Sequence, residues 1–191
     1  MSKATTKKYS SNFKDKVAIR LQATERINDI RVLDCFHAKG ELWNKIREYR
    51  NVNDFLGIEK NKKLKSTDRV IYDNNIKVLR EINIDNYNII DLDAYGNPFE
   101  QMNIVFERCK KPKIIIYTFI SFGISGIPKE INVFKECSLK CKTILNSYLE
   151  DMFENYLYKN GVSEYFEIKK NELSMTNKRY GFFYYNPLQK R

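Results

Sequence analysis

Two aspartates separated by a single residue are the strongest candidates in this sequence for catalysis or ligand binding. Asp91 and Asp93 close the apolar run Asn88–Asp93, and Ala94 and Tyr95 follow directly. On a β-strand, residues two apart point to the same face, so both carboxylates approach the carboxyl edge of a sheet, where burial without a partner is costly. A strand that simply ends in a turn needs one acid with Gly or Pro. The pair beside a tyrosine therefore favours a functional site.

Polar and small residues also follow three earlier apolar runs. After the first run, Ala38 and Gly40 lie just before a predicted helix, where small residues let a ligand approach the backbone. The second run ends in Glu59, 19 residues after Gly40, where an acid can accept hydrogen bonds from the ribose of an adenosine-containing ligand. The third ends in Asp73 and Asn74, whose carboxylate or amide can meet an adenine amino group; alternatively, Asp73 is the N-cap of the following helix.

Short apolar runs alternate with amphipathic segments along most of the chain. The runs are rich in Val, Ile, Leu, Phe and Tyr without strict polar alternation, which is typical of strands covered on both faces. This alternation predicts a parallel sheet with right-handed crossovers. The predicted strands are Arg31–Phe36, Asp54–Glu59, Arg69–Asp73, Asn88–Asp93 and Lys113–Phe119. The predicted helices are Val17–Asp29, Glu41–Arg50, Asn74–Ile82 and Phe99–Cys109.

The remainder of the chain predicts a long helix followed by two strands. The segment Lys129–Lys159 is amphipathic, and Asn160-Gly161 after it is a good helix terminator. The last two runs, Ser163–Lys169 and Lys178–Asn186, are joined by a short polar connection and are expected to pair as an antiparallel hairpin.

Together these elements predict an α/β fold of the doubly wound, Rossmann-like type. Its sheet is mostly parallel, has seven strands and ends in an antiparallel hairpin. The length of 191 residues suits one domain. We expect residues 1–16 to be a flexible basic tail and residues 17–191 to form that domain. The sequence leaves the oligomeric state open.

The net charge of +10 is concentrated at the two ends of the chain. Residues 1–16 hold five lysines and one aspartate, and residues 169–191 hold six Lys or Arg and one Glu. A near-neutral body with basic ends favours a polyanionic partner, because Lys and Arg gain affinity by displacing counterions from phosphates. We therefore expect a nucleic acid, RNA or DNA, as partner. The alternative is that the lysines only keep the protein soluble.

Membrane and metal functions are not expected. The longest nearly uncharged run, Ile114–Ile127, is shorter than the ~20 residues that span a bilayer, and no N-terminal signal peptide is visible, so we expect a cytoplasmic protein.

Cys137 and Cys141 are four residues apart and could share a helix face. The only histidine, His37, is far away in sequence, so we interpret the cysteines as structural thiols and expect no metal.

The acidic motif resembles a known signature. The segment Asp93-Ala94-Tyr95-Gly96-Asn97-Pro98 is similar to the D-x-D-P-[FY]-G-[ST]-P signature of the tRNA (guanine-N2)-dimethyltransferase family. The turn from Asp34 to Gly40 resembles that family's A-x-G version of the cofactor loop, which lacks the usual glycine triplet. The resemblance covers roughly residues 30 to 120. Two departures are Ala94 in place of the family's proline and no counterpart of its C-terminal tRNA-binding domain, which leaves the acceptor open.

The resemblance implies a class I methyltransferase that uses S-adenosylmethionine and methylates an amino nitrogen, here of a nucleic acid base. It implies ribose binding by Glu59 and adenine contact by Asp73 and Asn74. The cofactor-binding residues it implies are Asp34, Phe36, Ala38, Gly40, Glu59, Asp73 and Asn74. Asp93 is the implied catalytic residue, with Tyr95 beside it to stack on a base. The implied substrate-binding residues are Ala94, Asn97, Pro98 and Phe99.

Three alternatives remain open. A NAD-dependent dehydrogenase explains Glu59 but not the missing glycine triplet. A methyltransferase of this fold can also act on a protein or a small molecule, because fold does not fix substrate. A binding protein that has lost catalysis is the third, suggested by Ala94 and by the bulky Phe36, His37 and Lys39 in the cofactor loop. We expect His37 to face solvent in that loop.

Overall fold

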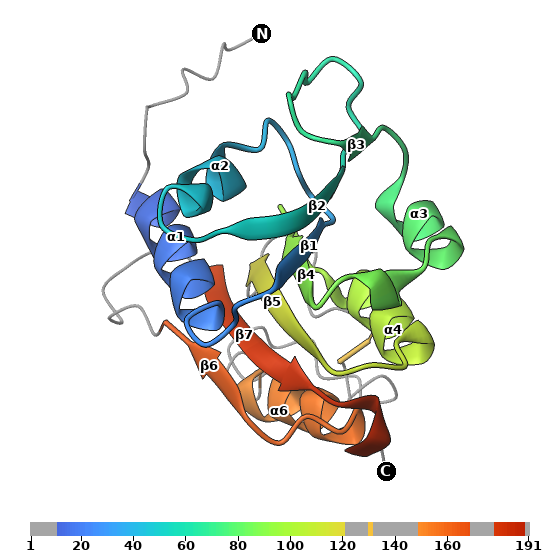
Figure 1. The fold of residues 1–191 in the computed structure, drawn as a ribbon. Coiled ribbons are helices and arrows are strands. Elements are labelled where there is room, and N and C mark those ends of the chain that lie inside the picture. Colours follow the sequence, from blue (N-terminus) through green and yellow to red (C-terminus); the bar gives the residue numbers. More distant parts are fainter. Residues whose placement is uncertain (1–10, 121–129, 132–148, 169–177, 190–191) are drawn as a thin grey trace, which may run out of the picture.

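The computed structural model describes residues 11–120, 130–131, 149–168 and 178–189 (Figure 1). The strands are β1 Ile30–Asp34, β2 Val52–Ile58, β3 Val70–Ile71, β4 Ile89–Asp93, β5 Lys113–Ile120, β6 Tyr165–Glu167 and β7 Lys178–Tyr185. The α-helices are α1 Ser11–Ala23, α2 Glu41–Arg47, α3 Asn75–Glu81, α4 Phe99–Arg108 and α6 Leu149–Lys159, and the 3-10 turns are η1 Ile84–Asn86 and η2 Pro187–Gln189. Each predicted strand is confirmed, with ends that differ by no more than two residues.

All seven strands form one sheet in the order β3-β2-β1-β4-β5-β7-β6. The pairs from β3 to β5 are parallel, whereas β7 runs antiparallel to both β5 and β6. The predicted hairpin is therefore present, and β7 is the reversed strand. Because β7 lies between β5 and β6, the sheet differs from the six-stranded parallel order 3-2-1-4-5-6 of dinucleotide-binding dehydrogenases.

Helices cover both faces of the sheet, as Figure 1 shows. One apolar cluster joins the sheet to α1 and α2, with Trp43 and Ile46 of α2 fully buried in it. A second, larger cluster joins the opposite face to α3, α4 and α6 and is rich in aromatic rings such as Phe99 and Phe153. Two cores on opposite faces are what a doubly wound sheet requires, so the predicted fold class is correct.

Helix α1 begins at Ser11 and ends at Ala23, six residues earlier at each end than the predicted Val17–Asp29. The reason is that Lys16 and Arg20, one turn apart, point to the sheet and pair with acids of β4 instead of facing water. Residues 11–16 therefore belong to the folded part and not to a tail. Residues 1–10 of the predicted tail lie outside the described residues.

The predicted helix Lys129–Lys159 is only partly seen. Glu130 and Ile131 lie in a turn, which corrects the predicted start, and residues 132–148 lie outside the described part. The predicted terminator is confirmed: Gly161 has a φ of 81°, and the Val162 N–H donates to the Leu157 carbonyl. Among the helices described, none combines the length and the apolar character that crossing a bilayer requires.

Candidate functional site

A cavity of about 640 Å³ opens at the carboxyl ends of the parallel strands. It is bordered by the loops after β1 and β2, the start of α3, the end of β4 and one residue of α1. The predicted site residues that line it are Phe36, Ala38, Glu59, Asp73, Asn74, Asp93, Ala94 and Tyr95. Residues from four strand ends thus meet at one edge, where open α/β sheets bind their ligands.

The loop after β1 is held in an unusual backbone conformation. Ala38 has a φ of 51°, which is rare for a residue with a Cβ, and Gly40 has a φ of 76°. The Glu59 carboxylate accepts a hydrogen bond from the Ala38 N–H at 2.8 Å, and the Asp34 carboxylate accepts one from the Phe36 N–H at 3.1 Å. Acids at the ends of β1 and β2 therefore fix the loop that borders the cavity.

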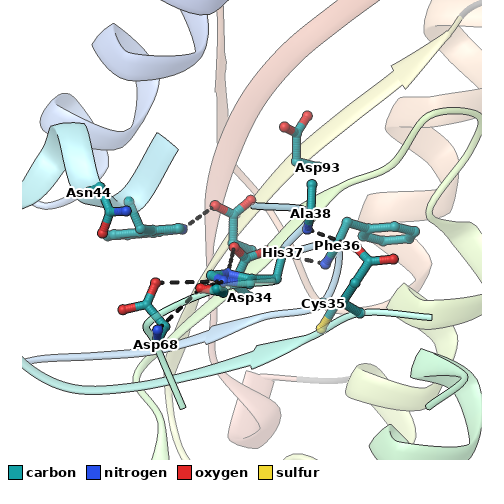
Figure 2. A network of polar contacts seen from close by, with 12 residues as sticks. Asp34, Cys35, Phe36, His37, Ala38, Asn44, Asp68 and Asp93 are labelled. Carbon is teal, nitrogen blue, oxygen red and sulfur yellow. Dashed lines mark hydrogen bonds and ion pairs between the residues drawn. The ribbon is translucent and has the colours of Figure 1, made fainter. Parts of the chain in front are cut away.

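The structure places His37 inside the protein, which corrects the prediction that it faces solvent. Only 3% of the residue is exposed. Its Nδ1 lies 3.3 Å from an Asp34 oxygen and its Nε2 lies 2.8 Å from Ser66 Oγ, with Asp68 also close (Figure 2). A Cβ on Gly57 would lie 2.6 Å from the imidazole ring, so a glycine on β2 makes room for it. The signal for this role, a glycine on the neighbouring strand, is visible in sequence only once the strand pairing is known.

Gly40 and Asp34 act on the loop and do not line the main cavity. A Cβ on Gly40 would lie 2.6 Å from His37 Cε1, so this position needs glycine both for its φ and for space. Asp34 borders a second, smaller cavity of about 290 Å³ on the other side of the loop. The two cavities share Phe36 and Asp93 among their lining residues.

Asp91 is a structural residue and not part of the cavity. It is fully buried beneath α1 and α2, where Arg20 donates to both of its oxygens at 2.7 Å and Trp43 Nε1 donates at 2.7 Å. Burial raises the pKa of Asp91 to about 6, although the Arg20 guanidinium opposes this shift. The prediction that both acids of the pair reach the strand edge is therefore wrong for Asp91, which instead anchors α1 to β4.

Asp93, two residues further, does reach the cavity. Its side chain is 14% exposed, and its Oδ2 accepts a hydrogen bond from Lys16 Nζ at 2.6 Å, with Arg20 at 3.9 Å. Burial alone would raise its pKa, but Arg20 and Lys16 outweigh this and hold the pKa below its ordinary value. Its Oδ1 is buried and forms no hydrogen bond within the described residues. Asp93 lines the cavity, whereas its Oδ1 atom is buried near Thr118, whose hydroxyl also lowers the Asp93 pKa.

A polar chain that the sequence did not suggest lines the opposite wall. The Gln101 amide donates to Asn75 Oδ1 at 3.1 Å, and Asn75 donates to the carbonyl of Cys35 at 2.9 Å. Gln101 Oε1 and Thr118 Oγ1 are buried and, within the described residues, have no hydrogen-bond partner. Thr118 pairs with Asp93 across β4 and β5, and its hydroxyl lowers the Asp93 pKa, so this wall of the cavity is polar.

At the rim, Asp73 and Asn74 take different positions. Asp73 is half-buried and accepts a hydrogen bond from Lys77 Nζ at 2.8 Å, and this contact lowers its pKa. Asn74 is the N-cap of α3, with its Oδ1 accepting from the Ile76 N–H at 2.8 Å. The N-cap is therefore Asn74, which corrects the alternative that Asp73 caps the helix, and both residues line the cavity.

The segment after Asp93 splits into a cavity rim and a core anchor. Tyr95 is 90% exposed and borders the cavity, and Asn97 is exposed but does not line it. Pro98 and Phe99 are buried, and Phe99 packs edge-on against Phe153 and Tyr156. Their prediction as substrate-binding residues is not supported by this placement, because the first residue of α4 points into the aromatic core.

No protein-family model matches the chain, and no curated protein sequence matches it. Solved structures do. Trm1 from Pyrococcus horikoshii, in complex with S-adenosyl-L-methionine, matches with a TM-score of 0.63 and 14% identity, over 100% of this chain and 60% of that one. A SAM-dependent methyltransferase from Archaeoglobus fulgidus matches with a TM-score of 0.55 and 12% identity, over 88% and 92%. TYW2 from M. jannaschii, in complex with AdoMet, matches with a TM-score of 0.52 and 14% identity, over 94% of this chain and 76% of that one.

The chain has the class I methyltransferase fold. This confirms the fold that the sequence predicted, and the match to Trm1 leaves 40% of that longer chain without a counterpart here. Within the methyltransferase fold, sequence reasoning missed Lys16, Arg20 and Gln101. All three come from helices, and their roles depend on contacts across 26 to 77 residues of sequence, which no local pattern reveals.

Of the two cysteines in the described residues, Cys35 borders the main cavity and Cys109 does not. Cys35 and Cys109 are buried free thiols, and burial raises the pKa of both. Cys137 and Cys141 lie outside the described residues, so the structural role predicted for them stays a prediction. Within the described part of the chain, no group of three or more His, Cys, Asp or Glu side chains is placed to hold a metal ion.

Proposed function

We propose that the chain is an S-adenosylmethionine-dependent methyltransferase that acts on an amino nitrogen, and that its acceptor is a nucleic acid base. The observation that carries this proposal is the position of the Asp93 carboxylate, which ends β4 at the main cavity of a methyltransferase fold. Two cations, Arg20 and Lys16, lower its pKa and so favour the ionised form. The resemblance of its flanking residues to the tRNA (guanine-N2)-dimethyltransferase signature supports the same role.

The cavity residues fit the cofactor. A volume of about 640 Å³ lies in the range of small-molecule sites. The lining carries four acids, Glu59, Asp73, Asp93 and Glu100, against two lysines, so its negative balance suits a sulfonium cation. Glu59 keeps lone pairs for ribose hydroxyls beyond the backbone N–H groups it already accepts. Asp73 and Asn74 at the cavity rim are the proposed partners of the adenine amino group.

The chemistry asked of the chain is mainly alignment. When bound, the cofactor supplies an activated methyl group, and in-line displacement then requires the acceptor nitrogen to be held next to it. A base amine is a weak nucleophile because its lone pair is delocalised into the ring. The Asp93 carboxylate and the Ala94 carbonyl can accept hydrogen bonds from its two N–H groups, which favours a pyramidal nitrogen and stabilises the developing positive charge.

Ala94 replaces the proline of the resembled signature, yet the turn is still held locally. The Ala94 N–H donates to the Leu92 carbonyl at 2.8 Å, a bond that proline cannot form. A hydrogen bond thus takes over part of the restraint that the proline ring supplies. This supports retained catalysis over a degenerate binding protein.

Three features support nucleic acid as acceptor. The chain carries a net charge of +10, Tyr95 stands 90% exposed at the rim where a base can stack, and the motif resembles that of a tRNA-modifying family. A protein or small-molecule acceptor is the second candidate, because the plantazolicin methyltransferase BamL also matches, with a TM-score of 0.58 and 11% identity.

Two measurements test the proposal. The first is calorimetry with S-adenosylmethionine, in which absence of binding at millimolar cofactor contradicts any methyltransferase. The second is incubation with methyl-labelled cofactor and separate pools of RNA, DNA and protein, with labelled nucleic acid expected.

The variant Asp93→Ala should lower turnover at least about 100-fold while cofactor affinity stays within about tenfold, because it removes a group that contacts the reacting amine. The matched control is Asp54→Ala, an acid of β2 whose partner Arg69 is exposed and which lies outside the cavity lining. Normal methylation by Asp93→Ala rules out the role given to Asp93, and label in protein alone rules out nucleic acid as the acceptor.

A further inference from the structure

The structure contains an amine at the position where the proposed mechanism needs one. Lys16 Nζ lies 2.6 Å from Asp93 Oδ2, and Lys16 lines both the main cavity and the smaller one beside it. Its side chain is 24% exposed, so water reaches it. A primary amine hydrogen-bonded to the candidate catalytic carboxylate has the contact expected of a methyl acceptor.

The position of Lys16 is imposed by the helix and not by a loose side chain. Arg20, one turn later in α1, donates from Nη1 to the Lys16 carbonyl at 2.9 Å and from Nε and Nη2 to Asp91. Arg20 is itself almost completely buried, with 1% of its side chain exposed. The backbone that carries Lys16 is therefore fixed against β4, and Nζ stays within reach of the cavity.

We infer that Lys16 is an internal methyl acceptor: in the absence of its substrate, the protein methylates its own Lys16 side chain. This inference rests on the proposed function. It makes Lys16 a modification site and an occupant of the acceptor position that the true substrate amine must displace from Asp93.

The step balances with the cofactor alone. The neutral Lys16 amine attacks the methyl carbon, so an N–C bond forms as the C–S bond breaks, and the electron pair leaves with sulfur to give S-adenosylhomocysteine. Before the transfer, the Lys16 ammonium loses one proton to water at its exposed side and becomes a neutral amine. After the transfer, the methylated nitrogen carries a positive charge. Asp93 stays ionised and stabilises that charge.

Mass spectrometry tests the site directly. Purified full-length protein is incubated with methyl-labelled S-adenosylmethionine and no acceptor, digested and mapped. Label on Lys16 is expected, with a first-order rate that does not depend on protein concentration. Lys14, exposed two residues earlier on the same helix and outside both cavities, is the internal control and should stay unlabelled. Label on Lys14 at the same rate, or a rate proportional to protein concentration, overturns the inference.

A binding measurement gives a readout that does not depend on turnover. S-adenosylmethionine carries a positive sulfur and S-adenosylhomocysteine does not, so a nearby ammonium disfavours only the first. The variant Lys16→Met should raise the affinity for S-adenosylmethionine relative to S-adenosylhomocysteine by roughly threefold to tenfold, and Lys14→Met should leave the ratio unchanged.

The outcomes separate the two proposals. If both cofactor forms bind and an added acceptor is methylated, but Lys16 stays unlabelled and the affinity ratio of Lys16→Met equals that of the wild type, only the inference about Lys16 fails. If neither cofactor form binds, the proposed function fails and the inference fails with it.

Discussion

The imidazole of His37 shows how a single residue shapes the main cavity without lining it. It is wedged between Gly40 in the loop and Gly57 on β2, and its two nitrogens lie next to Asp34 and Ser66. These contacts of His37 hold the loop that borders the cavity in place. Its strained residue Ala38, with a φ of 51°, is held because these contacts outweigh the cost of that conformation.

The variant Gly57→Ala tests this packing. A Cβ there would lie 2.6 Å from His37 Cγ, so either the ring or the strand must move, and we expect a loss of about 1–3 kcal/mol in the free energy of unfolding. Urea unfolding followed by circular dichroism measures it. The control is Gly96→Ala, whose added Cβ meets nothing within 4 Å and which should change stability little. Equal stability of both variants would show that His37 is not confined by β2.

The pKa values of Asp93 and Asp91 are shifted in opposite directions. Asp91 is fully buried and Asp93 is partly buried, but Asp93 has a lowered pKa because Arg20 and Lys16 together outweigh its burial. A carboxyl group whose pKa is lowered by folding contributes stability above its ordinary pKa of about 3.9, and this contribution is lost as pH falls through the folded value. Removing a cation reverses part of the shift, so the pKa must rise.

The variant Lys16→Met should therefore move the titration midpoint of Asp93 to higher pH. Carboxyl carbon shifts followed by NMR across the acid range measure this directly and do not require turnover. Lys77→Met is the control: it removes the cation beside Asp73, so the midpoint of Asp73 should rise while that of Asp93 stays constant. A midpoint for Asp93 that does not respond to Lys16→Met would mean that Arg20 alone sets its charge.

At the scale of elements, helix α1 is joined to strand β4 by one buried ion pair. Arg20 donates two hydrogen bonds to Asp91 at 2.7 Å, and Trp43 of α2 adds a third. Breaking such a pair by removing one partner leaves a buried charge uncompensated. The same contact determines where Lys16 lies, so stability and site geometry depend on it together.

We expect Arg20→Met to lower the free energy of unfolding by about 3–5 kcal/mol, because the buried Asp91 loses its cation and must either stay charged or take up a proton. Denaturant unfolding measures the loss. The double variant Arg20→Met/Asp91→Leu removes both charges and should recover most of it, with a smaller cost remaining because Trp43 loses its acceptor. If the single variant loses less than about 1 kcal/mol, the ion pair is not what fixes α1.

The sequence predicted the strands well because their signal is local. Runs such as Lys113–Ile120 carry enough apolar and β-branched residues to identify a buried strand without knowledge of its neighbours. Helix α1 was misplaced because its polar first half resembles a tail until its lysine and arginine find partners on β4. Phe99 was misassigned because the rotation of α4, which turns this residue into the core, is set by packing against Phe153 and Tyr156.

Prediction of the cavity residues followed from topology. Once strands were assigned, parallel pairing brought Ala38, Glu59, Asn74 and Asp93 to one edge, and the structure places all four on the cavity lining. Gln101 could not be found in this way. It is the third residue of α4, and only the tertiary position of that helix directs its amide toward Asn75.

At the scale of the whole molecule, charge is the property that bears most on the acceptor. Much of the net charge of +10 comes from the terminal segments of the sequence, while the cavity lining is acidic on balance. The two regions suit different ligands: the lining suits a cationic cofactor, and the basic ends suit phosphates.

A chain that begins at Ser11 lacks Lys3, Lys7 and Lys8 and tests this division. If these lysines contact phosphates, the slope of log affinity against log salt for RNA should become shallower by roughly 2–3 units, whereas cofactor affinity should not change. Fluorescence anisotropy over a salt series measures the slope, and calorimetry the cofactor. An unchanged slope would show that these lysines only aid solubility.

The two outermost strands of the sheet are short. Strand β3 has two residues and β6 has three, although the interior strand β5 has eight. Each flank of the described sheet therefore presents only a brief row of unpaired backbone groups, too little to template the growth of a fibril or the docking of another polypeptide's strand. We therefore expect the short edge strands to limit self-aggregation, in addition to the repulsion among the many cations of the chain.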